Sequence, residues 1–86
     1  MEDRSLMETK TLRTQSDRQL RLEYYLIRDS AGSYGVEVCA SGPGGDERVC
    51  IPDLTPAHER VRALLARLAA GLVTPTGVCD IVQDWL

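Results

Sequence analysis

The sequence predicts an α+β fold, in which a three-stranded antiparallel meander is followed by two C-terminal helices packed on one of its faces (β-β-β-α-α). Between residues 19 and 51, apolar residues recur with a period of two and are interrupted twice by turn-forming residues. After residue 54 the apolar period becomes helical, and each of two such stretches follows a Thr-Pro pair. Short connections then place successive elements side by side around one core.

Length and charge limit the classes of function. The chain has 86 residues, of which 43% are hydrophobic and 27% charged, as expected for one small soluble domain. Its net charge of -3 leaves no positive excess for a phosphate backbone. No apolar run approaches the roughly 20 residues that cross a bilayer, and the acidic start is unlike a secretory signal. We therefore expect a cytoplasmic protein that binds neither nucleic acid nor membrane.

Residues 1–18 differ from the rest of the chain. They carry as many acids as bases, and their large apolar residues, Leu6, Met7 and Leu12, define no face that is wide enough to bury. We expect a flexible N-terminal arm here and a single α+β domain over residues 19–86. The β-propensity of Thr9–Thr14 leaves open the alternative of an added edge strand.

The first expected strand begins at Gln19. Even-numbered apolar residues from Leu20 to Leu26 face one side, whereas Arg21 and Glu23 face the other. Tyr25 and Ile27 add apolar bulk to this second face, so we expect protein to cover part of it. Residues 29–33 form a turn.

The next two strands span residues 34–40 and 47–51, joined by a hairpin loop at Ser41–Asp46. Tight pairing across this loop predicts that Ala40 faces Glu47, that Cys39 faces Arg48 and that Cys50 faces Glu37. The two thiols are then diagonal, which disfavours a disulfide, and we expect all three cysteines to be reduced.

Both helices are expected to start at a Thr-Pro pair, where the Thr caps free N–H groups and the Pro loses no hydrogen bond. The first helix would start at Thr55-Pro56, bury a leucine-rich stripe and stop at Gly71. The second would start at Thr74-Pro75 and has weak intrinsic propensity, so that packing must hold it. Its apolar stripe comprises Val78, Ile81, Val82, Trp85 and Leu86.

Residues that support catalysis or metal binding are few. His58 is the one histidine, and although His58–Arg62 begins like a zinc-protease helix, Arg62 stands in place of the second histidine ligand. The cysteines form no C-x-x-C pair. We therefore expect a non-catalytic protein with no metal and no cofactor. One alternative is a small-molecule-binding protein or a thiol-dependent enzyme around a cysteine and His58. A further alternative, a nucleic-acid-associated regulator, would need a basic face despite the net charge.

Two pairs of apolar residues are the hardest to place in a single core. They are Tyr25 with Ile27, and Trp85 with Leu86. They form the candidate surface for binding another protein, or a second copy of this chain as a homodimer. The alternative for Trp85 and Leu86 is that they form the last layer of the core.

Several segments resemble a family of short, uncharacterised bacterial proteins that is classed as a domain of unknown function. They are Tyr24–Leu26, Tyr34–Val38, Pro52–Pro56, Thr74-Pro75 and Asp80–Leu86. The resemblance covers about Leu22 to Leu86, and Gln83 departs from a family ending in which an acid is more usual. It implies a stand-alone bacterial cytoplasmic protein and transfers no catalytic or binding residue.

Overall fold

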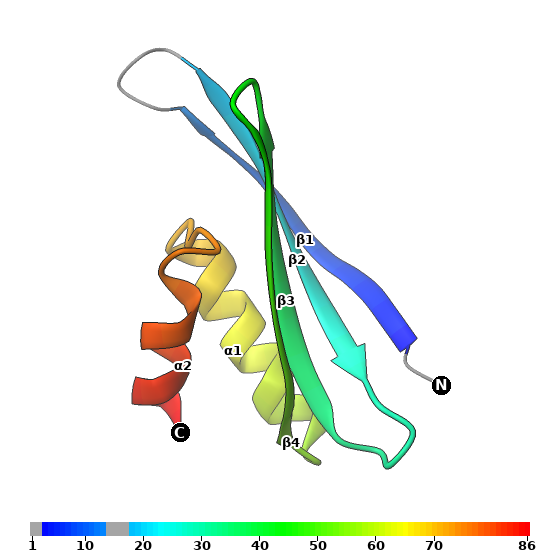
Figure 1. Ribbon diagram of the computed structural model, residues 1–86. Helices are drawn as coiled ribbons and strands as arrows, with labels where there is room; N and C mark the ends of the chain where they lie inside the picture. Colours follow the sequence, from blue (N-terminus) through cyan, green and yellow to red (C-terminus); the bar gives the residue numbers. More distant parts are fainter. Residues whose placement is uncertain (1–2, 14–17) are drawn as a thin grey trace.

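A computed structural model describes residues 3–13 and 18–86, and its elements form one antiparallel sheet with two helices behind it (Figure 1). The strands are β1 (Asp3–Arg13), β2 (Gln19–Arg28), β3 (Tyr34–Gly42) and β4 (Gly45–Thr55), in the spatial order β1-β2-β3-β4. The helices are α1 (His58–Ala70) and α2 (Val78–Trp85). The α+β class and the two C-terminal helices are confirmed, but the expected number of strands was wrong, because the sheet has four.

The additional strand comes from the segment in which we expected a flexible arm or an edge strand. β1 lies at the edge of the sheet and pairs with β2 from Asp3↔Arg28 to Arg13↔Gln19. Most of its side chains are exposed, so burial of an apolar face is not what holds it in the sheet. Backbone pairing along β2 holds it instead. Residues 1–2 and 14–17, including Thr14 of the expected edge strand, lie outside the described residues.

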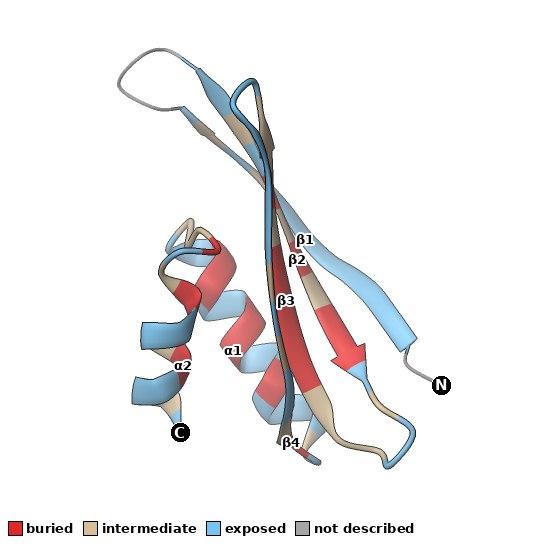
Figure 2. Ribbon diagram, in the orientation of Figure 1, coloured by how far each residue is buried: buried red, intermediate tan, exposed pale blue. Residues whose placement is uncertain are grey.

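The core lies between the sheet and the helices (Figure 2). The alternating residues of β2 and β3 face α1 and α2 as their period predicts, and burial of each large apolar side chain stabilises the fold by about 1.5–3 kcal/mol. Fully buried side chains include Leu22, Tyr24, Val36, Val38, Val61, Leu64, Leu68 and Val78. None of the helices in the described ranges is long and apolar enough to span a membrane.

The β3–β4 hairpin has the expected register. Ala40 pairs with Glu47, Cys39 with Arg48, and Glu37 with Cys50. The strands continue closer to the turn than expected, since Gly42 pairs with Gly45 across Pro43 and Gly44. Gly45 has a φ of 115°, which only glycine adopts readily and which lets so short a connection close.

Strand β4 does not end at Ile51, as expected, but continues through a bulge to Thr55. Val36 pairs with Ile51 whereas Tyr34 pairs with Thr55, so β4 has extra residues opposite Gly35. The bulge presses its backbone against β3. A methyl group at Gly35 would overlap the Ile51 carbonyl oxygen and lie 2.6 Å from the Pro52 Cα, so only glycine fits there.

Both helices start later than their Thr-Pro pairs predict. Thr55 belongs to β4, and its Oγ1 accepts a hydrogen bond from the Ala57 N–H at 3.1 Å instead of capping α1, which begins at His58. α2 begins at Val78, three residues after Pro75. Gly71 does end α1, although the residue with left-handed backbone is Leu72, at φ 51°. A hydrogen bond of 2.8 Å from the Tyr24 hydroxyl to the Val73 carbonyl ties this connection to the sheet.

Candidate interaction surfaces

The sheet has one face covered by the helices and one open face, on which Tyr25 and Ile27 lie (Figure 1). Tyr25 is half-buried beneath Arg4, whose guanidinium carbon lies 3.7 Å from the ring centre. Its hydroxyl donates to Glu23 Oε2 at 3.4 Å. Ile27, opposite Gly35, is only 4% exposed. Neighbouring side chains, rather than a helix, thus cover the apolar part of this face.

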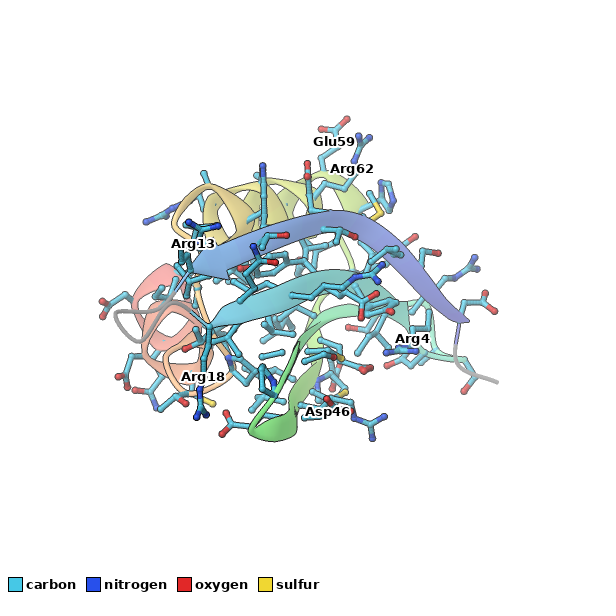
Figure 3. The ribbon with its side chains drawn as sticks, turned by 90° about the horizontal axis from the view of Figure 1, so that it is seen from above. Arg4, Arg13, Arg18, Asp46, Glu59 and Arg62 are labelled. Atoms are coloured by element: carbon cyan, nitrogen blue, oxygen red, sulfur yellow. The ribbon has the colours of Figure 1, made fainter. Side chains whose placement is uncertain are left out.

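The open face is organised around the carboxylate of Glu37, whose side chain is only 5% exposed. Arg4 Nε donates to Oε1 at 3.0 Å and Arg4 Nη2 lies 2.9 Å from Oε2, which is the two-pronged geometry favoured between guanidinium and carboxylate. Arg48 Nε approaches the same Oε2 at 3.7 Å. Arg4 reaches across β2 to do this, and Figure 3 shows its side chain extending from β1 toward the other edge. The Arg4–Glu37 pair therefore fastens edge strand β1 to β3.

Cys39 lies beside this ion pair. Its Sγ is 3.6 Å from both Glu37 Oε2 and Arg4 Nη2. Burial, together with the negative charge of Glu37, raises the pKa of the Cys39 thiol. Hydrogen bonding to Glu37 raises the pKa of Arg4. The thiol is therefore held protonated at neutral pH, whereas a nucleophilic cysteine needs a lowered pKa.

His58 is not close to this thiol. It opens α1 on the covered side of the sheet, and its ring meets Tyr34 edge-on with 5.1 Å between the ring centres. Cys50 and Cys79 are exposed, on β4 and α2 respectively. Across the described ranges, no three His, Cys, Asp or Glu side chains lie close enough together to hold a metal ion.

Trp85 is the last residue of α2 and Leu86 follows it, so both lie on the helix-covered side of the sheet, opposite to the side of Tyr25 and Ile27. Trp85 is half-buried and packs against the core, and the guanidinium carbon of Arg60 lies 4.7 Å from the centre of its ring. Leu86 is 74% exposed. The two predicted pairs therefore form no common surface, and within them Leu86 is the most accessible side chain.

Strand β1 carries the apolar surface that the sequence analysis missed. Leu6 is 49% and Met7 37% exposed. Leu6 lies opposite Tyr25 on the open face, and a bulge separates it from Glu8, which lies opposite Tyr24. Met7 and Glu8 instead line a groove of 160 Å³ against α1. We call Leu6, Met7, Glu8, Lys10 and the groove residues Arg62, Leu65 and Ala66 the β1 edge surface.

A second hollow, of 380 Å³, lies where the β3–β4 hairpin extends beyond the helices. It combines the acids Asp46 and Glu47 with the hydroxyls of Thr74 and Thr76 and apolar contributions from Leu20 and Ala40. Neither His58 nor a cysteine lines it, so it holds no thiol or imidazole for nucleophilic catalysis.

These features define a small α+β domain with an open sheet face and an accessible edge. The chain belongs to a family of unknown function (DUF6514), whose family model matches residues 3–86. The match includes β1, which the resemblance seen in the sequence did not cover. Comparisons with the curated proteins and with the solved structures found no match.

Proposed function

We propose that this protein is a non-catalytic interaction module that binds another protein through the β1 edge surface. The observation that carries the proposal is the exposure of two large apolar side chains on one edge strand, Leu6 on the open face of the sheet and Met7 beside the groove against α1. Exposed apolar groups on an edge strand with unpaired backbone groups favour strand addition by a partner.

The groove beside Met7 supports the same proposal. Its walls come from β1 and α1, and Leu65 and Ala66 supply apolar contacts while Glu8 and Arg62 supply charge. A strand added to β1 would lay its side chains along this groove, as in other proteins that bind extended segments between an edge strand and a helix.

The competing proposal is a thiol-dependent or small-molecule-binding role around a cysteine and His58. It requires a thiol with a lowered pKa within reach of the imidazole. Cys39 has a raised pKa and lies on the open face, whereas His58 contacts Tyr34 on α1's side of the sheet. These observations favour the interaction module.

Photo-crosslinking in the producing cells tests the proposal. A benzophenone side chain replaces Met7 in one variant and exposed Gln83 of α2 in a matched variant. We expect covalent adducts with protein, of either this chain or another, from position 7 and few from position 83. Adducts from position 83 alone would assign binding to the C-terminal helix, and adducts from neither would contradict an interaction module.

A further inference from the structure

We propose that the partner at the β1 edge is a second copy of this chain, paired antiparallel and centred on Thr9, so that the two sheets join into one. This inference rests on the proposed function and identifies the partner. A two-fold axis normal to the sheet keeps each face on its own side, so opposed residues must come from the same face.

Charge complementarity selects Thr9 as the centre. Glu8 pairs with Tyr24 and Lys10 with Leu22, so both side chains point to the helix-covered face, while Thr9 pairs with Glu23 on the open face. Centring on Thr9 places each Glu8 opposite the partner's Lys10, and Thr9 opposite the partner's Thr9. Opposite charges and Thr–Thr pairs are both stabilising cross-strand neighbours.

Other symmetric registers of β1 are poorer. Centres at Glu8 or Lys10 place like charges opposite each other, and a centre at Met7 falls on the bulge, where the strand is irregular. A centre at Leu6 would oppose Arg4 and Glu8, but the bulge at Met7 places these two on different faces. The regular part of β1, from Glu8 onward, therefore has one register in which the charges match.

The opposite edge of the sheet is less suited to self-pairing. A symmetric β4–β4 pairing centred on Asp46, Glu47 or Arg48 places that charged residue opposite its own copy. A pairing centred on Val49 places Glu47 opposite the apolar Ile51 of the second copy. Pro52 also lacks the N–H that a ladder needs. Pairing through β1 alone gives a closed dimer rather than a growing chain of sheets.

The groove next to β1 accommodates the partner's lysine. In the proposed register, the stem of the partner's Lys10 runs along Met7, Leu65 and Ala66 and its ammonium group meets Glu8. Within the part of the chain that the structure describes, the side chains of Glu8 and Lys10 form no ion pair. Arg62 also lines this groove, and Figure 3 shows its side chain beside that of Glu59 on α1.

Charge-swap variants test the register, with sedimentation velocity as the readout of association. Wild type is expected to be a dimer. Glu8→Lys and Lys10→Glu each turn both central pairs into like-charge pairs, so each is expected to weaken association by at least about tenfold. An equimolar mixture of these two variants restores both pairs and is expected to form a heterodimer. Glu59→Lys, with the same charge change on exposed α1, is the matched control and stays dimeric.

Mixing separates a defect in pairing from a defect in folding, since misfolded variants do not recover when combined. Thr9→Cys gives a second readout: oxidation should yield a peptide disulfide joining the two substituted positions, identified by mass spectrometry. A monomeric wild type overturns the second-copy inference, and adducts of Met7 with a different protein would then leave the interaction module standing. A dimer that neither swap weakens overturns the Thr9 register.

Discussion

Glu37 is the residue on which the open face of the sheet depends. A buried carboxylate is strongly unfavourable unless it is paired, and here Arg4 and Arg48 supply the positive charge. The two arginines come from the two opposite edge strands, β1 and β4, so one side chain in β3 links both edges of the sheet. The alternation of β3 placed Glu37 on this face, but no sequence pattern indicated Arg4, because its role depends on β1 being a strand.

Replacing Arg4 by Ala tests this connection. The substitution leaves the Glu37 carboxylate buried with Arg48 alone at 3.7 Å, so we expect a loss of about 1–3 kcal/mol in the free energy of unfolding and faster amide hydrogen exchange in β1. Arg21→Ala is the matched control, because its contact with Glu23 is longer, at 3.8 Å, and exposed. The control should cost less than about 0.5 kcal/mol. Equal effects of the two substitutions would contradict a special role for Arg4.

Tyr24 gives the protein a defined sensitivity to alkali. Burial raises the pKa of its hydroxyl to about 12, from an ordinary value near 10. The unfolded state therefore loses this proton at a lower pH than the folded state does. The free energy of unfolding keeps its full value below pH 10 and falls as the pH rises from 10 through 12. We expect Tyr24→Phe to reduce this alkaline loss while costing about 1 kcal/mol at neutral pH through its hydrogen bond to Val73. Urea unfolding at pH 7 and at pH 11 measures both effects, and an unchanged pH dependence would contradict the assignment to Tyr24.

At the scale of elements, the bulge in β4 has two effects: it requires a glycine at position 35 of β3, and it delays the start of α1. Extra residues opposite Gly35 bring the β4 backbone into contact with β3, and they delay the start of the helix. Thr55 therefore bonds to Ala57 within the approach to the helix rather than capping it. The sequence signals for a helix start were all present, but the strand pairing competed for the same residues.

Gly35→Ala tests the close approach. The added methyl group would meet backbone atoms, which cannot move aside as a flexible side chain can, so we expect a loss of at least about 2 kcal/mol. Gly44→Ala is the matched control, because a methyl group there meets nothing within 4 Å. The control should change the free energy of unfolding by no more than about 0.5 kcal/mol. Urea unfolding of both variants gives the comparison, and a tolerated Gly35→Ala would show that the bulge can relax.

The same scale shows how much could be predicted from the sequence. Period-two alternation fixed the core-facing residues of β2 and β3, and a tight hairpin was enough to derive the pairing of Cys39 with Arg48. The period-two pattern did not predict β1, because the stability of this strand comes from backbone pairing and from Arg4 rather than from an apolar face. The exposed surface of Leu6 and Met7 was not predicted for the same reason. Their adjacency within a polar segment was the available signal, but exposure on an edge becomes visible only once the strand order is known.

At the scale of the whole molecule, small size makes association and stability inseparable. A chain of 86 residues buries only about 60–65% of its unfolded surface, so its folding free energy is small.

Because a second copy that binds only the folded chain stabilises it, the proposed dimer predicts a melting temperature that rises with protein concentration. A concentration about 100-fold above the dissociation constant adds about 2.7 kcal/mol, and each kcal/mol raises the midpoint by about 4–8 °C in a domain of this size. Calorimetry over a hundredfold range of concentration should show this rise for wild type and for the mixture of Glu8→Lys with Lys10→Glu, whereas Glu8→Lys alone should need a higher protein concentration to reach the same midpoint. A wild-type midpoint that is independent of concentration would mean that the sheet is stable with its β1 edge unpaired.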